Sequence, residues 1–166
     1  FFYDNPLSTA GTYHRRPWFG CSCCPTNLIR FIPSIGGYAF ATAGNTIYLN
    51  QFIQSEAKIR TPDGDVRLSI QTDYPWDGRV TISIGGCKGS RLFKVRLPGW
   101  CERSELRHNG SAILPGDDGY YTFYIAEGDQ IDYQMDMPVR RVYADPRVAE
   151  DRGRVAVMRG PIVYCA

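Results

Sequence analysis

The sequence predicts a mainly β protein: an antiparallel β-sandwich of jelly-roll type, preceded by a loop and one short helix. After about Gly44, short runs of β-branched and aromatic residues alternate with turn residues at intervals of roughly ten positions, which is typical of sandwiches and barrels. Before that point only one segment has helical periodicity. The 166 residues, 43% of them hydrophobic, suffice for one domain with a substantial core, or for one domain and part of another.

The first part of the chain, residues 1–24, shows no sustained periodicity and is predicted to be a long loop with aromatic anchors. Long ordered loops that lead into a helix are frequent locations of functional sites. The sequence opens at Phe1 without an initiator Met and without the basic and apolar regions of a signal peptide. We therefore expect it to be a fragment of a longer protein.

A short helix is predicted over residues 25–35. Leu28, Phe31, Ile32 and Ile35 stand at positions i, i+3, i+4 and i+7, which places them on one helical face. Pro25 suits the first helical turn, where its missing N–H costs nothing. Pro33 removes a backbone hydrogen bond near the end, so we expect a kinked or loosened last turn before Gly36 and Gly37 stop the helix.

Eight to ten strands are predicted in the rest of the chain. Turn chemistry with a known mechanism separates them, as at Asn109-Gly110 and Asp118-Gly119. Because few helices lie between the strands, the sheets should be antiparallel. The candidate strands are residues 46–52, 56–60, 66–71, 79–84, 93–97, 106–109, 120–125, 130–135, 141–144 and 155–159.

Charge and hydropathy exclude two classes of partner. The 19 basic and 17 acidic side chains leave a formal net charge of +2, and no basic run is long enough to follow a phosphate backbone. No apolar run approaches the length of a bilayer-spanning segment. We therefore expect neither a nucleic acid nor a membrane as a partner.

Three of the six cysteines fall within four positions, at Cys21, Cys23 and Cys24. A helix that begins here, with Cys24 near its N-cap and Pro25 at its first position, would favour the negative charge of a thiolate. A thiolate attacks carbon electrophiles and binds soft metals. The cluster could equally be a structural metal knuckle, a redox pair or buried thiols. No second pair of metal-ligand spacing occurs, since His14 and His108 stand alone.

The remaining candidates favour structural interpretations. Single cysteines in strand-like segments usually behave as small buried hydrophobic residues, which we expect of Cys87, Cys101 and Cys165. A lone His14 and the pair Arg15-Arg16 are expected to be solvated. Trp18 and Phe19 could form a sugar-stacking platform but are expected to pack against the start of the helix. Three carboxylates are possible general acids whose turn contexts favour capping instead: Asp4, Asp73 and Asp77.

Several motifs together resemble the C-terminal part of the glycoside hydrolases of family 127, the β-L-arabinofuranosidases. The most specific is the cysteine box within RRPWFGCSCCPTNLIRFIPSIGGY, residues 15–38. The others are YDNPL (3–7), TDYPWDG (72–78), RLPGWC (96–101), HNG (108–110), EGD (127–129) and RVAVMRGPIVYC (154–165).

The resemblance implies an (α/α)6 barrel that carries the active site, followed by β-sandwich domains. Residues 1–44 would then be the C-terminal end of the catalytic barrel with the cysteine box, and residues 45–166 a β-sandwich domain. In this family a cysteine thiolate attacks the anomeric carbon, and three cysteines and a glutamate hold a zinc ion. Matched by motif, Cys23 would be the nucleophile and a zinc ligand, Cys24 a second zinc ligand, and Cys21 a supporting residue.

The substrate implied is a non-reducing-end β-L-arabinofuranoside, hydrolysed with retention. The other zinc ligands and the acid/base carboxylate would lie upstream, so we expect this segment alone to be inactive. The sandwich would wall one side of the pocket or mediate dimerisation. A carbohydrate-binding or structural sandwich, and a structural-zinc or redox module, are the alternatives. Because thiolates persist best in a reducing compartment, the expected location is cytoplasmic.

Overall fold

The computed structural model describes residues 10–18 and 20–164, and the chain divides into two compact units, residues 1–37 and 38–166. In the first unit, helix α1 spans Cys23–Phe31 and continues as the 3₁₀ helix η1, Ile32–Tyr38, which crosses into the second unit. The α-helix thus begins two residues before the predicted start. The expected loosening near Pro33 is confirmed, because this proline cannot donate the backbone bond that would continue the α-helix.

The apolar face of this helix is exposed. The four residues predicted to share one face, Leu28, Phe31, Ile32 and Ile35, keep between 37% and 61% of their surface accessible. An apolar stripe of this size on a surface marks a region that contacts another part of a protein. No helix in the described part of the chain is long and apolar enough to cross a membrane.

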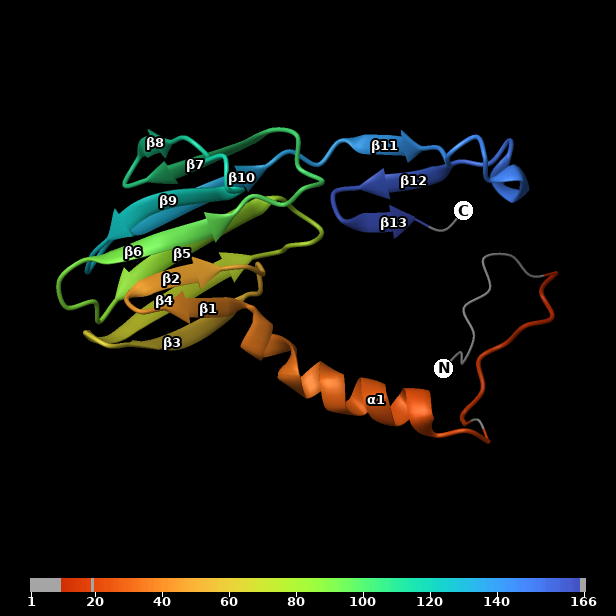
Figure 1. The fold of residues 1–166 in the computed structure, drawn as a ribbon, viewed down its shortest axis with the longest axis horizontal. Coiled ribbons are helices and arrows are strands. Elements are labelled where there is room, and N and C mark those ends of the chain that lie inside the picture. The colour runs from red at the N-terminus through yellow and green to blue at the C-terminus, as the bar shows by residue number, and fades with distance from the viewer. Residues whose placement is uncertain (1–9, 19, 165–166) are drawn as a thin grey trace. The chain divides into compact units, whose positions relative to one another are not determined.

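The second unit contains two packed sheets (Figure 1). The four-stranded sheet has the order β1-β2-β6-β9 and consists of β1 (Phe40–Ala43), β2 (Thr46–Leu49), β6 (Arg91–Arg96) and β9 (Tyr120–Ile125). The six-stranded sheet has the order β3-β4-β5-β10-β7-β8 and consists of β3 (Ser55–Thr61), β4 (Gly64–Thr72), β5 (Arg79–Gly85), β10 (Gln130–Met135), β7 (Ser104–His108) and β8 (Ser111–Ile113). All their ladders are antiparallel except β2–β6, which is parallel.

The hydrophobic core lies between these two sheets. Alternate residues of both sheets are buried, as strands with one solvated face require. Phe93 and Phe123 meet edge to face from the four-stranded sheet, and Tyr121 meets Tyr133 of the other sheet in the same way, with ring centroids 5.8 and 5.4 Å apart. The two-layer sandwich predicted from the sequence is confirmed.

Three strands form a separate antiparallel sheet, ordered β11-β12-β13: β11 (Val139–Val142), β12 (Ala156–Arg159) and β13 (Ile162–Tyr164). A short 3₁₀ helix, η2 (Ala149–Asp151), lies between β11 and β12. The predicted sandwich strands include β11 and β12, which lie in this separate sheet, and do not include β1, β8 and β13. These three strands have only three or four residues each, too few for alternation to be recognised. β1 also places the first strand at Phe40, before the expected domain boundary at residue 44.

Two of the predicted turns have clear physical reasons for their residues. Asn109 and Gly110 both have positive φ, 49° and 83°, between the paired strands β7 and β8. This is the backbone that two-residue type I′ hairpins require. In the TDYPWDG motif, the backbone N–H of Met135 donates to Gly78 O at 2.9 Å, and a Cβ at Gly78 would collide with the carbonyl oxygen of Met135.

A side-chain network joins the HNG and EGD motifs. His108 Nε2 lies 2.7 Å from Asp129 Oδ2, and the Asn109 side chain donates to Asp129 Oδ1, also at 2.7 Å. The backbone N–H of Ala126 donates to the same carboxylate at 2.8 Å. Burial alone would raise the pKa of Asp129, but these hydrogen bonds outweigh it and hold the pKa below its ordinary value of 3.8. His108, alone in the sequence, therefore has a structural partner.

A buried arginine fastens a second pair of loops. Arg91 is only 3% exposed, and its guanidinium donates to the carbonyl oxygens of Asp63, Lys88 and Ser90 at 2.7–3.0 Å and to Thr61 Oγ1 at 3.2 Å. These acceptors lie at the β3–β4 turn and in the β5–β6 loop. A buried guanidinium that donates to four acceptors fixes both loops against the sandwich.

Replacing Asp129 with Asn should reduce stability at neutral pH by about 1–2 kcal/mol, because hydrogen bonds to a charged acceptor are lost. The folded-state pKa of Asp129 is lowered, so its stabilisation is present above the unfolded-state value and disappears as pH falls through the folded-state value. Urea unfolding from about pH 5 to 3 should show a shallower acid loss for Asp129→Asn than for the wild type. Asp117→Asn, at an exposed carboxylate between β8 and β9, is the control. An identical acid slope in Asp129→Asn and wild type would contradict this role.

Arg91→Ala should lower the free energy of unfolding by about 2–4 kcal/mol, because it leaves buried acceptors unpaired and opens a cavity. Arg60→Ala, at an exposed position on β3, should change it by less than about 0.5 kcal/mol. Urea midpoints of the two variants measure the difference. Equal midpoints would show that Arg91 does not fasten the loops.

Candidate active site at the start of helix α1

The cysteine box forms the start of α1. Ser22 is the N-cap residue, Cys23 the first helical residue and Cys24 the second, so the predicted N-cap near Cys24 is corrected by two positions. The side chain of Ser22 makes no capping hydrogen bond. Instead Thr26 closes the first turn: its N–H donates to Ser22 O at 3.1 Å and its hydroxyl to the same oxygen at 2.7 Å. Cys23 and Cys24 are thereby held on consecutive helical positions.

The three thiols of the box lie close together and are exposed. The Sγ atom of Cys23 is 3.2 Å from Cys21 Sγ and 3.6 Å from Cys24 Sγ. Both distances exceed the roughly 2.05 Å of a disulfide bond, so neither pair is covalently joined. Cys23 is the central sulfur of the three.

The donor set suits a soft metal ion at Cys23 and Cys24. Two thiolates that bind one tetrahedral zinc ion at 2.3 Å lie about 3.8 Å apart, and the Cys23–Cys24 sulfur distance of 3.6 Å is close to this. No acidic side chain occupies the first turn of α1 to oppose the binding of anions or thiolates at this helix end. Within residues 10–18 and 20–164, however, no group of three Cys, His, Asp or Glu side chains is arranged to hold a metal ion. Further ligands would be needed.

The other predicted residues of the N-terminal loop are exposed wherever the structure describes them. The exposed candidates are His14, Arg15, Arg16 and Trp18, and Trp18 keeps 55% of its surface accessible. The predicted candidates Asp4, Phe19 and Cys165 lie outside the described residues. The described contacts join the three cysteines of the box to one another.

The two described cysteines outside the box are buried, as predicted. Burial raises the pKa of the Cys87 thiol and of the Cys101 thiol. Each donates to a backbone carbonyl oxygen, Cys87 to Gly89 at 3.5 Å and Cys101 to Arg103 at 3.1 Å. These are the properties of structural cysteines.

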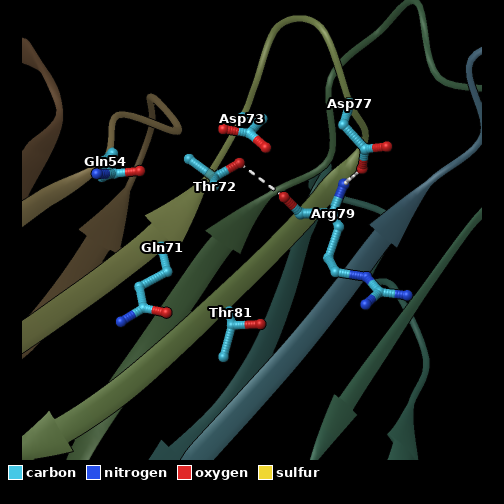
Figure 2. A pocket seen from close by; sticks show the side chains of 7 residues that line it. All are labelled: Gln54, Gln71, Thr72, Asp73, Asp77, Arg79 and Thr81. Carbon is cyan, nitrogen blue, oxygen red and sulfur yellow. Dashed lines mark hydrogen bonds between the residues drawn. The ribbon is translucent and has the colours of Figure 1, made fainter.

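Asp73 and Asp77 belong to a polar groove that the sequence analysis did not identify. Asp77 Oδ1 accepts a hydrogen bond from Arg79 N at 2.7 Å, which confirms the predicted capping role. Figure 2 shows both carboxylates at the ends of β4 and β5, above Gln71 and Thr81. The groove could have been predicted from the sequence, because the residues of β4 and β5 that alternate with the buried ones are polar.

Comparison with protein families defines the class as a glycoside hydrolase. Residues 1–37 match the "Beta-L-arabinofuranosidase, GH127 catalytic domain", residues 46–137 the "GH127 middle domain" and residues 139–166 the "Glycoside hydrolase family 127 C-terminal domain". The chain belongs to glycoside hydrolase family 127. The resemblance drawn from the motifs is confirmed.

Individual relatives agree. The chain is 38% identical over 173 residues to a non-reducing end beta-L-arabinofuranosidase of Bifidobacterium longum subsp. longum, with 98% of this chain and 26% of that protein covered. Among solved structures, a GH127 beta-arabinofuranosidase has a TM-score of 0.89 at 37% identity, covering 98% of this chain and 29% of its own. The GH127 beta-L-arabinofuranosidase of Geobacillus stearothermophilus T6 has a TM-score of 0.86 at 33% identity, covering 98% and 28%. The chain thus spans about a quarter of the length of these relatives.

Thiol labelling tests the contrast between the two groups of cysteines. With metal removed by chelation, iodoacetamide should modify Cys21, Cys23 and Cys24 at least about tenfold faster than Cys87 and Cys101, whose thiols are buried and have raised pKa values. Peptide mass spectrometry over time gives the order. Labelling of Cys87 or Cys101 at the rate of the box would contradict the described burial.

Proposed function

We propose that this chain is the C-terminal part of a retaining exo-glycosidase that removes β-L-arabinofuranose from non-reducing ends, with Cys23 as the nucleophile. The observation that carries the proposal is the position of Cys23. It is the central sulfur of three at a helix start, within the segment that matches the catalytic domain of the family. The names of the relatives supply the substrate class.

In the first step the Cys23 thiolate attacks the anomeric carbon, and an S–C bond forms as the bond from that carbon to the leaving oxygen breaks. A carboxylic acid outside this segment gives the leaving oxygen its proton. In the second step the resulting carboxylate takes a proton from water, which attacks the same carbon and releases Cys23 as a thiolate. Two displacements at one carbon retain its configuration.

A zinc ion would be held by Cys23 and Cys24, together with a cysteine and a glutamate from outside this segment. When bound, it would supply a positive charge that keeps the attacking sulfur deprotonated at neutral pH. Cys24, whose sulfur lies 3.6 Å from that of Cys23 in the first helical turn, would hold the ion and not attack, as the family resemblance implies. Cys21, at 3.2 Å from Cys23, would orient that sulfur.

The exposed face of α1 supports the view that the catalytic pocket needs more chain than these residues. We propose that Leu28, Phe31, Ile32 and Ile35 pack against the remainder of an (α/α)6 barrel. The 166-residue chain alone would then be inactive. A thiolate nucleophile also favours a reducing compartment, so we propose a cytoplasmic location, which fluorescence of the tagged parent protein would test.

The parent protein with Cys23→Ser should lose at least about a thousandfold in kcat on an aryl β-L-arabinofuranoside, because a serine hydroxyl without a general base is a weak nucleophile. Cys24→Ser should lose bound zinc as well as activity. Cys87→Ser makes the same substitution in the sandwich and should keep kcat within about threefold. Kinetics and metal analysis of the folded variants distinguish them. Near wild-type activity of Cys23→Ser would remove Cys23 from the nucleophile role.

A further inference from the structure

Two rows of polar side chains cross the outer face of the six-stranded sheet. In the first row, register pairs Gln71 of β4 with Thr81 of β5. Thr81 pairs in turn with Asp132 of β10, and Asp132 with Arg107 of β7. In the second row, Arg79 of β5 is beside Gln134 of β10 and Glu105 of β7. Because neighbouring strands lie about 4.8 Å apart, four strands give a polar surface about 14 Å wide.

The surface is hollowed where the first row meets the loop between β4 and β5. This groove, which we call the Gln71 groove, has a volume of about 470 Å³ and is lined by Gln54, Gln71, Thr72, Asp73, Asp77, Arg79 and Thr81. Figure 2 shows Gln71 and Thr81 on its floor and the two carboxylates at its upper rim. A second hollow of about 390 Å³ shares Arg79 and Thr81 and continues over β10 and β7.

Much of the hydrogen-bonding capacity in the groove is uncommitted. The side chains of Gln54, Gln71 and Asp73 and the guanidinium of Arg79 make no hydrogen bond or ion pair to any side chain or backbone group in the described part of the chain. The loop between β4 and β5 is fixed by a hydrogen bond from β12, in which Arg159 Nη1 donates to Trp76 O at 2.6 Å. Uncommitted polar groups on a fixed loop are available to hydrogen-bond a ligand.

The chemistry of the lining identifies the class of ligand. Over the two hollows, four acidic side chains outnumber the cations Arg79 and Arg107, which disfavours phosphates and other anions; the acids are Asp73, Asp77, Glu105 and Asp132. Charged groups across the surface also disfavour a permanent protein interface, whose centre is depleted of charge. Carboxamide, carboxylate and guanidinium groups are planar and paired, so each can bind two neighbouring hydroxyl groups at once.

We propose that the Gln71 groove binds the neutral pentose units of an L-arabinofuranose oligosaccharide. The exposed indole of Trp76, with 66% of its surface accessible in the same loop, offers a face on which a sugar ring can stack. The choice of arabinose rests on the proposed function, whereas the preference for a neutral polyhydroxyl ligand rests on the groove alone.

The test is titration of the 166-residue chain, carrying Cys23→Ser, with a β-linked L-arabinofuranosyl disaccharide, followed by amide chemical shifts in NMR. Saturable shifts are expected at β4, β5 and the loop between them, including the side-chain amide of Gln71. The double variant Gln71→Ala, Asp73→Ala should bind at least about tenfold more weakly, which corresponds to the loss of one or two hydrogen bonds to charged or amide groups. Arg60→Ala, exposed on β3 of the same sheet, should bind within about twofold of the parent chain.

Several outcomes would overturn the proposal: no saturable shifts, equal weakening by Arg60→Ala, preferential binding of a sulfated polysaccharide, or shifts at the same amides on raising protein concentration without sugar. The last would make this face an interface between copies. Matching circular dichroism spectra confirm that each variant is folded. Since Cys23 is already replaced, failure of this titration leaves the nucleophile assignment standing. Likewise, a result that removed Cys23 from the nucleophile role would not affect sugar binding observed at the groove.

Discussion

The spacing of two sulfur atoms on consecutive helical residues is the constraint on which the catalytic account depends. The first turn of α1, closed by the hydroxyl and amide of Thr26, holds Cys23 Sγ and Cys24 Sγ 3.6 Å apart. That separation is close to the spacing of two thiolates that bind one tetrahedral zinc ion. A helix start one residue later would make Cys23 the N-cap residue and leave it outside the first helical turn. The backbone at Ser22 and Thr26 is therefore as much a part of the proposed site as the thiols are.

The most distinctive sequence motifs of the sandwich have structural roles. The HNG and EGD turns meet through the carboxylate of Asp129, and TDYPWDG needs Gly78 because Met135 approaches its backbone. Arg91 joins the β3–β4 turn to the β5–β6 loop. Among the described residues of the groove, the side chains of Gln54, Gln71 and Asp73 and the guanidinium of Arg79 make no hydrogen bond or ion pair within the described part of the chain. This division separates the residues that build the scaffold from those available to a ligand.

Local patterns predicted most of the fold. The spacing of Leu28, Phe31, Ile32 and Ile35 gave the helical face, and Asn109-Gly110 gave the hairpin, because each depends on neighbouring residues only. The parallel pairing of β2 with β6 and the separate sheet of β11 to β13 depend on contacts between distant segments. For the same reason the sequence could suggest a role for Cys23 but could not pair His108 with Asp129. The zinc assignment came from the family resemblance and not from spacing.

The central claim is that a sugar becomes covalently attached to one particular sulfur. The most direct measurement is to inactivate the full-length enzyme with a mechanism-based β-L-arabinofuranose analogue and to locate the adduct by peptide mass spectrometry. The account predicts a single glycosyl adduct on Cys23. An adduct on Cys21, on Cys24 or on a carboxylate elsewhere in the protein would contradict it.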